Sequence, residues 1–133
     1  MQNRLIRIAA ISGALAVALG AMGAHALKGK ISPEMLQVFE TGSRYQFYHS
    51  LALLAVALLM ERNSSKFLRY SGGLFILGIV LFSGSLYFLS LQPLLGMENM
   101  RWIGAITPLG GLCFIAGWLF LAIPFSGKSS PQS

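Results

Sequence analysis

The chain has 133 residues, of which 55% are hydrophobic and only 11% are charged. Soluble domains carry about 25% charged residues, so this composition excludes an ordinary soluble fold and indicates a membrane protein. The length is that of one compact bundle rather than two domains. A single cysteine, Cys113, excludes an internal disulfide and a cysteine-based zinc cluster. The net charge of +6 does not indicate binding to nucleic acid, because the basic residues lie singly or in loose pairs between apolar runs.

Four uncharged stretches, counted with histidine neutral, predict four membrane-spanning helices. These stretches cover residues 8–27, 45–60, 70–97 and 102–127. A span needs roughly 20 residues, so the second one must include flanking residues, with Arg44 and Arg62 reaching to the interface. We therefore predict an all-α membrane protein, a four-helix bundle that forms a single domain over residues 1–126. Its spans are expected at about 5–27, 44–61, 70–92 and 102–124, followed by a disordered tail at 127–133.

The first stretch ends in "GAMGAHALKG", residues 20–29, which has two interpretations. Ala24-His25-Ala26 has the A-x-A form of a signal-peptide cleavage site. However, the apolar core before it is at or beyond the upper length of a signal peptide, and three further apolar stretches follow. We therefore predict that this segment is the retained end of the first helix.

The loop after the first helix contains signals for a short helix of its own. In "SPEMLQVFETG", Ser32 is a suitable N-cap and Gly42 a suitable end, and the apolar side of this segment predicts an interfacial helix. Ser43 and Gln46 then have the spacing of a capping box, which predicts that the second membrane helix starts at Arg44. Pro93 is expected to end the third helix.

The basic residues predict an orientation in the membrane. Six of them lie on the side of the N-terminus, the loop after the second helix and the C-terminal tail, and four lie on the opposite side. Positive residues in short loops resist translocation, so both termini are expected in the cytoplasm of a bacterial, multi-pass inner-membrane protein.

Small residues recur at helical spacing and predict close helix packing. Within a bilayer, helices approach one another through such residues, and spacings of three and four favour a tight left-handed bundle with little room for a wide pore. The frequency of glycine in membrane helices accounts for part of the pattern. The glycines expected at helix contacts are Gly13, Gly20, Gly23, Gly78 and Gly111.

Four segments together resemble a known family. These are "AAISGALAVALGAMGAHAL", "FETGSRYQFYHSLALL", "LFSGSLYFL" and "TPLGGLCFIAGW", in this order. They are similar to the bacterial inner-membrane family known as domain of unknown function 423, to which the human transmembrane protein 256 group is related. The resemblance covers about residues 5 to 122 and implies a small four-span membrane protein with no established reaction, cofactor or substrate.

Polar residues gather in the half of the predicted bundle that faces outward, and they are candidates to line a pocket. Each has a simpler interpretation: tyrosines form interfacial belts, serines bond to helix carbonyls, and arginine anchors a short helix. The two histidines are expected at similar depths, either as interfacial groups or as a pair that shares a proton or a soft metal. The candidate pocket residues are His25, Arg44, Tyr45, Gln46, Tyr48, His49, Ser83, Ser85, Tyr87 and Thr107.

Three functions are compatible with these residues. The first is a non-catalytic protein that binds membrane lipids, a membrane-protein partner or a second copy of itself. The second is a small transporter or channel, which Pro108 beside Gly110 and Gly111 would favour, although no acidic residue lies within a predicted span except Glu61 at the end of the second one. The third is an enzyme or metal site based on His25 and His49. Because no catalytic or phosphate-binding motif accompanies them, we predict a protein that is not an enzyme and carries no metal or cofactor.

Overall fold

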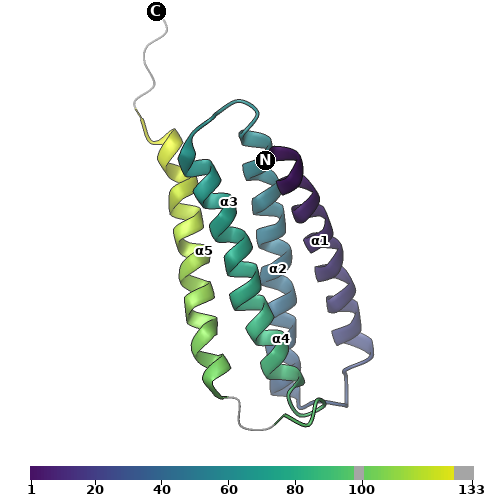
Figure 1. Cartoon of the computed structure of the whole chain (residues 1–133). Helices are drawn as coiled ribbons and strands as arrows, with labels where there is room; N and C mark the ends of the chain where they lie inside the picture. Colours follow the sequence, from purple (N-terminus) through teal and green to yellow (C-terminus); the bar gives the residue numbers. More distant parts are fainter. Residues whose placement is uncertain (98–100, 128–133) are drawn as a thin grey trace, which may run out of the picture.

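The computed structural model describes residues 1–97 and 101–127, and these residues form helices joined by turns. The helices line up as four long rods (Figure 1). The first two rods are α1 (Gln2–His25) and α2 (Pro33–Leu59). The third rod consists of α3 (Lys66–Gly78), a π-helical turn η1 (Ile79–Ser83) and α4 (Gly84–Leu91). The fourth consists of η2 (Arg101–Ala105), α5 (Ile106–Ala122) and η3 (Ile123–Phe125).

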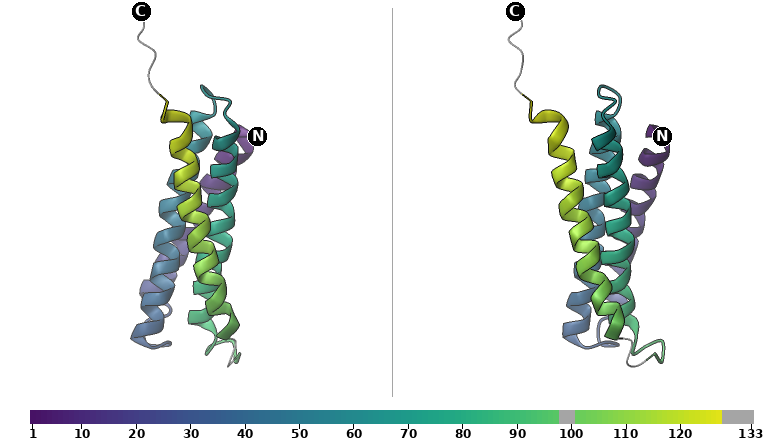
Figure 2. Two further views of the ribbon diagram at one scale, coloured as in Figure 1. Left: turned by 90° about the vertical axis from the view of Figure 1, so that its left-hand side faces the viewer. Right: turned by 60° about the vertical axis from the view of Figure 1, so that its left-hand side comes forward.

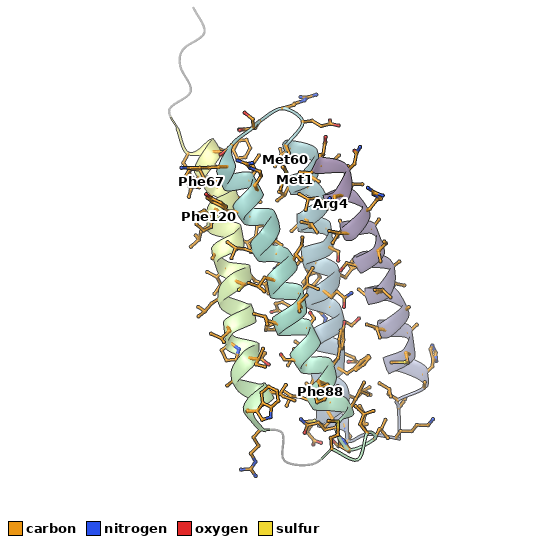
Figure 3. All side chains as sticks on the ribbon, viewed as in Figure 1. Met1, Arg4, Met60, Phe67, Phe88 and Phe120 are labelled. Carbon is orange, nitrogen blue, oxygen red and sulfur yellow. The ribbon has the colours of Figure 1, made fainter. Side chains whose placement is uncertain are left out.

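The rods pack as neighbours in an antiparallel bundle. Helix α1 packs against α2, and α5 packs against α3 and η1 (Figure 2). One apolar cluster lies between α2, α3 and α5 and includes Phe75 and Phe114, and a second lies between α1 and α2 and includes Leu5 and Leu53. The start of α1 and the end of α5 lie at the same end of the bundle, where Figure 3 labels Met1 and Phe120.

Among the described residues, three rods are long and apolar enough to cross a membrane: Gln2–His25, Lys66–Leu91 and Arg101–Phe125. Helix α2 has the length, since its 27 residues extend about 40 Å at 1.5 Å per residue. Its first half is less apolar, because it carries Glu34, Glu40 and Arg44. Over the described residues, the structure therefore shows an all-helical protein with three helices that could cross a membrane, and the second predicted span, at 44–61, falls on the second half of α2.

The prediction of a separate interfacial helix is wrong. Ser32 does cap a helix, accepting a 3.2 Å hydrogen bond from the Met35 N–H, but that helix continues without a break to Leu59. Gly42 does not end this helix. Instead it leaves room for the Tyr87 ring, since a Cβ at position 42 would lie 3.0 Å from a ring carbon. Glycine at this position permits a close contact between rods rather than a change of direction.

The predicted capping box is also wrong, because Ser43 lies inside α2 and turns away from that helix. Its hydroxyl donates to the carbonyl of Ala16 in α1 at 2.8 Å. By contrast, the third rod ends at Leu91, shortly before Pro93, as the proline predicts. The tail prediction concerns residues 127–133, of which 128–133 lie outside the described residues.

The glycines predicted at helix contacts differ in how closely they are approached. A Cβ on Gly20 would lie 3.1 Å from the Ser43 hydroxyl, and one on Gly23 would lie 2.9 Å from the Phe39 ring. At Gly78 the ring of Phe114 occupies the place of a side chain. Gly13 and Gly111 have ordinary van der Waals space, with nearest atoms at 3.8 and 3.9 Å. Close approach is therefore concentrated at three of the five positions.

Candidate functional site

A polar network joins α1, α2 and α4 inside the bundle. The Gln46 side-chain amide donates to the Ser12 carbonyl at 2.9 Å, and its oxygen accepts from the Tyr87 hydroxyl at 2.6 Å. The Ser12 and Ser50 hydroxyls lie 2.7 Å apart. Gln46 and Ser50 are buried, with exposed fractions of 5% and 3%. One buried glutamine thus bridges three helices, at a depth where an unpaired polar group is costly.

The direction of the bonds in this network follows from the single proton on each hydroxyl. The Ser50 oxygen lies 2.7 Å from the Gln46 backbone carbonyl, which can only accept. Ser50 is the donor both to that carbonyl and to the Ser12 hydroxyl, so its single proton serves one of these two acceptors at a time. The same Gln46 nitrogen also lies 3.4 Å from the Ser12 hydroxyl oxygen, which is too long for a strong bond.

His49 lies at another contact, between α2 and α5, and both of its ring nitrogens are engaged. The Trp118 indole N–H donates to Nε2 at 3.1 Å, so Nε2 must be the unprotonated nitrogen. Nδ1 then carries the proton and donates to the Tyr45 carbonyl at 2.7 Å. The ring stacks on Phe114 with centroids 3.6 Å apart. This geometry holds a neutral histidine and leaves no lone pair for a metal.

The two histidines are not brought together. His25 is the last residue of α1 and is exposed at that end of the bundle. His49 lies within α2 and packs against α5, on the side of α2 away from the α1 contact. Among the described residues, no group of three or more His, Cys, Asp or Glu side chains is placed to hold a metal ion.

The remaining predicted pocket residues are also distributed over several contacts. Arg44, Tyr45 and Tyr48 are exposed on α2. Ser85 and Thr107 share a 2.6 Å hydrogen bond between α4 and α5. The Ser83 hydroxyl in η1 is fully buried and finds no hydrogen-bond partner within the described residues. The structure therefore does not gather the predicted residues into one pocket.

A cavity of about 300 Å³ lies beside the polar network, between α1 and the α3–η1 segment. Ser12 and Gln46 supply its polar lining, and the rest is aliphatic. The cavity opens on the side of the bundle, because Ile11 and Val80 on its two walls are each 62% exposed. The aliphatic lining residues are Ile8, Ile11, Leu15, Ile76, Ile79 and Val80.

Comparison with known proteins places the chain in a family. The profile described as "Protein of unknown function (DUF423)" matches residues 19–111. The chain belongs to the DUF423 family. A DUF423 relative from Bacillus subtilis, UPF0382 membrane protein YwdK, is 46% identical over 119 residues, covering 89% of this chain and 92% of that protein. The UPF0382 inner membrane protein YgdD of Escherichia coli is 41% identical over 124 residues, covering 92% and 90%.

A third DUF423 relative, a UPF0382 membrane protein of Haemophilus influenzae, is 42% identical over 130 residues, covering 97% of this chain and 99% of that protein. No solved structure matches the chain. The names of these relatives agree that this is a membrane protein and assign no activity to it.

Sequence reasoning missed three residues that form these contacts in the DUF423 chain, Ser12, Ser50 and Trp118, and it assigned Ser43 to a capping box instead of to the contact with α1. Two signals pointed to them. Ser12, Ser43 and Ser50 lie in or beside apolar stretches, where a hydroxyl needs a partner, and Trp118 lies far from the ends of its apolar stretch. A tryptophan at that depth needs an acceptor for its N–H, and His49 is that acceptor.

Proposed function

We propose that this chain is a four-span, non-catalytic protein of the bacterial inner membrane that binds a lipid from the surrounding bilayer. The observation that carries this proposal is the lateral cavity between α1 and the α3–η1 segment. Its walls are aliphatic, and its opening faces the side of the bundle, where hydrocarbon chains surround a membrane protein. A ligand can enter such a cavity from the bilayer without passing through water.

Two observations favour binding over transport. Pro108 lies in the first turn of α5, where proline is tolerated, and α5 continues unbroken through Gly110 and Gly111. A discontinuous helix, which is typical of transporter sites, is therefore not formed there. The close contact of Gly110 with the backbone of Phe82 brings α5 against η1 and leaves little space between these two rods.

The proposed topology places both termini in the cytoplasm, with α2 as a span in addition to the three apolar rods. The start of α1 and the end of α5 lie at one end of the bundle, which also carries Arg62, Lys66 and Arg69. Reporter domains fused after Arg62 and after Phe125 are expected to remain cytoplasmic, and one fused after Lys30 is expected to be exported. Export of both the Lys30 and the Arg62 fusions would contradict α2 as a span.

Lipid binding is tested by identifying what the purified protein retains. The wild-type protein, extracted in a mild detergent, is expected to carry lipid in native mass spectrometry. The double variant I11F/V80F narrows the cavity from both walls and is expected to retain at least severalfold less lipid, because phenylalanine fills space that the ligand needs. The matched control, L112F/L119F, adds the same groups to the exposed face of α5 and is expected to retain lipid as the wild type does. Equal retention by all three proteins would contradict the proposal.

A further inference from the structure

The polar part of the lateral cavity lies at mid-depth in the bundle. Gln46 is the fourteenth of the 27 residues of α2, so it is about 20 Å along the axis from either end at 1.5 Å per residue. The hydrocarbon core of a bilayer is about 30 Å thick. If α2 spans the membrane, the Gln46 amide lies inside the hydrocarbon core, whereas Arg44, about 3 Å earlier along the axis, is exposed and reaches toward the interface with its long side chain.

This depth restricts the chemistry of a ligand. None of the residues that line the cavity is charged. A phosphate or ammonium group brought to this depth would lose its hydration without gaining an ionic partner, which is strongly unfavourable. A phospholipid with its headgroup at the interface would present only its hydrocarbon chain here. The polar lining at Gln46 and Ser12 therefore fits an uncharged group that is itself soluble in hydrocarbon.

The hydrogen bonds define which uncharged group is favoured. The Gln46 oxygen already accepts from Tyr87 at 2.6 Å, and one amide N–H donates to the Ser12 carbonyl at 2.9 Å. The same nitrogen carries two protons, and its second printed contact, with the Ser12 hydroxyl, is 3.4 Å long, so one proton is left without a strong acceptor among the described residues. A carbonyl oxygen, which accepts and never donates, is the complementary partner for this N–H.

The wall opposite α1 is built from an irregular part of the third rod. Ile79 and Val80 belong to the π-helical turn η1, and both line the cavity. Such turns are rare and frequently occur at functional sites, because the wider turn displaces side chains from regular helical positions. The local distortion and the polar lining therefore coincide at one cavity.

We propose that this cavity binds a lipophilic, uncharged carbonyl compound whose carbonyl oxygen accepts a hydrogen bond from the Gln46 side-chain amide. The hydrocarbon part of the ligand lies against the aliphatic walls and extends through the opening between Ile11 and Val80 into the bilayer. This inference rests on the proposed lipid-binding function and specifies its ligand class. A lipid-soluble quinone and the ester of a neutral acylglycerol both carry the required group.

The test compares two probes that differ only in the carbonyl: a radiolabelled long-chain methyl ketone and the alkane with the same number of carbons. Each is equilibrated with the protein in phosphatidylcholine nanodiscs, and empty nanodiscs give the background partitioning. The wild-type protein is expected to bind the ketone about five- to tenfold more tightly than the alkane, as one hydrogen bond in an apolar site provides. Equal binding of ketone and alkane would overturn the inference.

Variants separate the hydrogen bond from the cavity. Q46L removes the donor with little change in volume, so binding of the alkane is expected to persist while the preference for the ketone disappears. I11F/V80F is expected to weaken the binding of both probes, and L112F/L119F is expected to leave the binding of both unchanged. Because Q46L also removes structural bonds, its thermal melting is measured in the same nanodiscs. If Q46L unfolds, Q46E at a pH that keeps the carboxyl neutral replaces it; a ketone preference retained by a folded Q46L protein would refute the assignment.

Two further probes distinguish the sources of the carbonyl. A benzoquinone with a decyl chain and a diacylglycerol are measured against the same alkane reference. Preference for either one that depends on Gln46 supports the inference and identifies the ligand type. If I11F/V80F loses its co-purified lipid but no carbonyl probe is preferred by the wild type, lipid binding stands and the carbonyl inference falls. If the wild type retains no lipid but prefers the ketone, the carbonyl inference stands, and the proposal that the cavity holds a lipid from the bilayer falls.

Discussion

Replacing Gly110 with alanine is expected to lower the free energy of unfolding by about 1–3 kcal/mol, as overpacking of a close contact does. A Cβ at this position would meet the backbone of Phe82, with the Phe82 Cα at 2.7 Å. Backbone atoms cannot rotate away as the end of a side chain can. The α5 helix must therefore move from η1, and the packing of Phe114 against α3 is disturbed with it.

The adjacent residue provides the matched control. A Cβ on Gly111 would lie 3.9 Å from the Phe82 ring, which is an ordinary contact. Alanine is a better helix former than glycine by about 1 kcal/mol, so Gly111→Ala is expected to leave stability unchanged or to raise it. Thermal melting of both variants in the same detergent measures the difference. Equal melting temperatures would show that α5 does not approach η1 as closely as described.

Replacing Gln46 with leucine is expected to cost about 1–2 kcal/mol of stability, because hydrogen bonds between membrane helices contribute about 0.6 kcal/mol on average and up to about 1.7. The substitution removes the bonds to Ser12 and Tyr87 and leaves the Tyr87 hydroxyl without its acceptor. Tyr87→Phe removes only one of these bonds and is expected to cost less. Reversible unfolding in detergent or bicelles provides the measurement.

A double-mutant cycle isolates the bond between Gln46 and Tyr87. The loss in the double variant Q46L/Y87F is expected to be smaller than the sum of the two single losses, because both substitutions remove the same hydrogen bond. Tyr48→Phe serves as the control, since Tyr48 is 51% exposed on the same helix and is expected to be additive with Q46L. Additive losses for Q46L and Y87F would contradict a direct bond between them.

Several features of this protein were determined by the sequence alone, because they depend on composition and on neighbouring residues. A high apolar fraction identified a membrane protein, and long uncharged stretches located the rods. Ser32 and Pro93 marked a helix start and a helix end correctly, since capping and the missing N–H of proline act within one turn. The four family segments identified the family that the profile match confirms.

Other features were decided only by the tertiary structure, because the same local signal has two physical meanings. Gly42 has the signature of a helix end, yet it serves a contact with the Tyr87 ring inside an unbroken α2. Ser43 and Gln46 have the spacing of a capping box, yet their polar groups bond across to α1 because each helix interior already satisfies its own backbone.

The polar residues show most clearly that a local pattern does not determine which side chains meet. Sequence places His25 and His49 at helix ends on one side of the membrane, but the continuity of α2 puts His49 within a helix and against Trp118 of α5. Which polar side chains meet depends on the rotation and register of whole helices, and these are set by contacts far apart in the chain. The sequence by itself determined the membrane class, the rods and the family, whereas only the packing of the rods decided that Gln46 lies beside a lateral cavity.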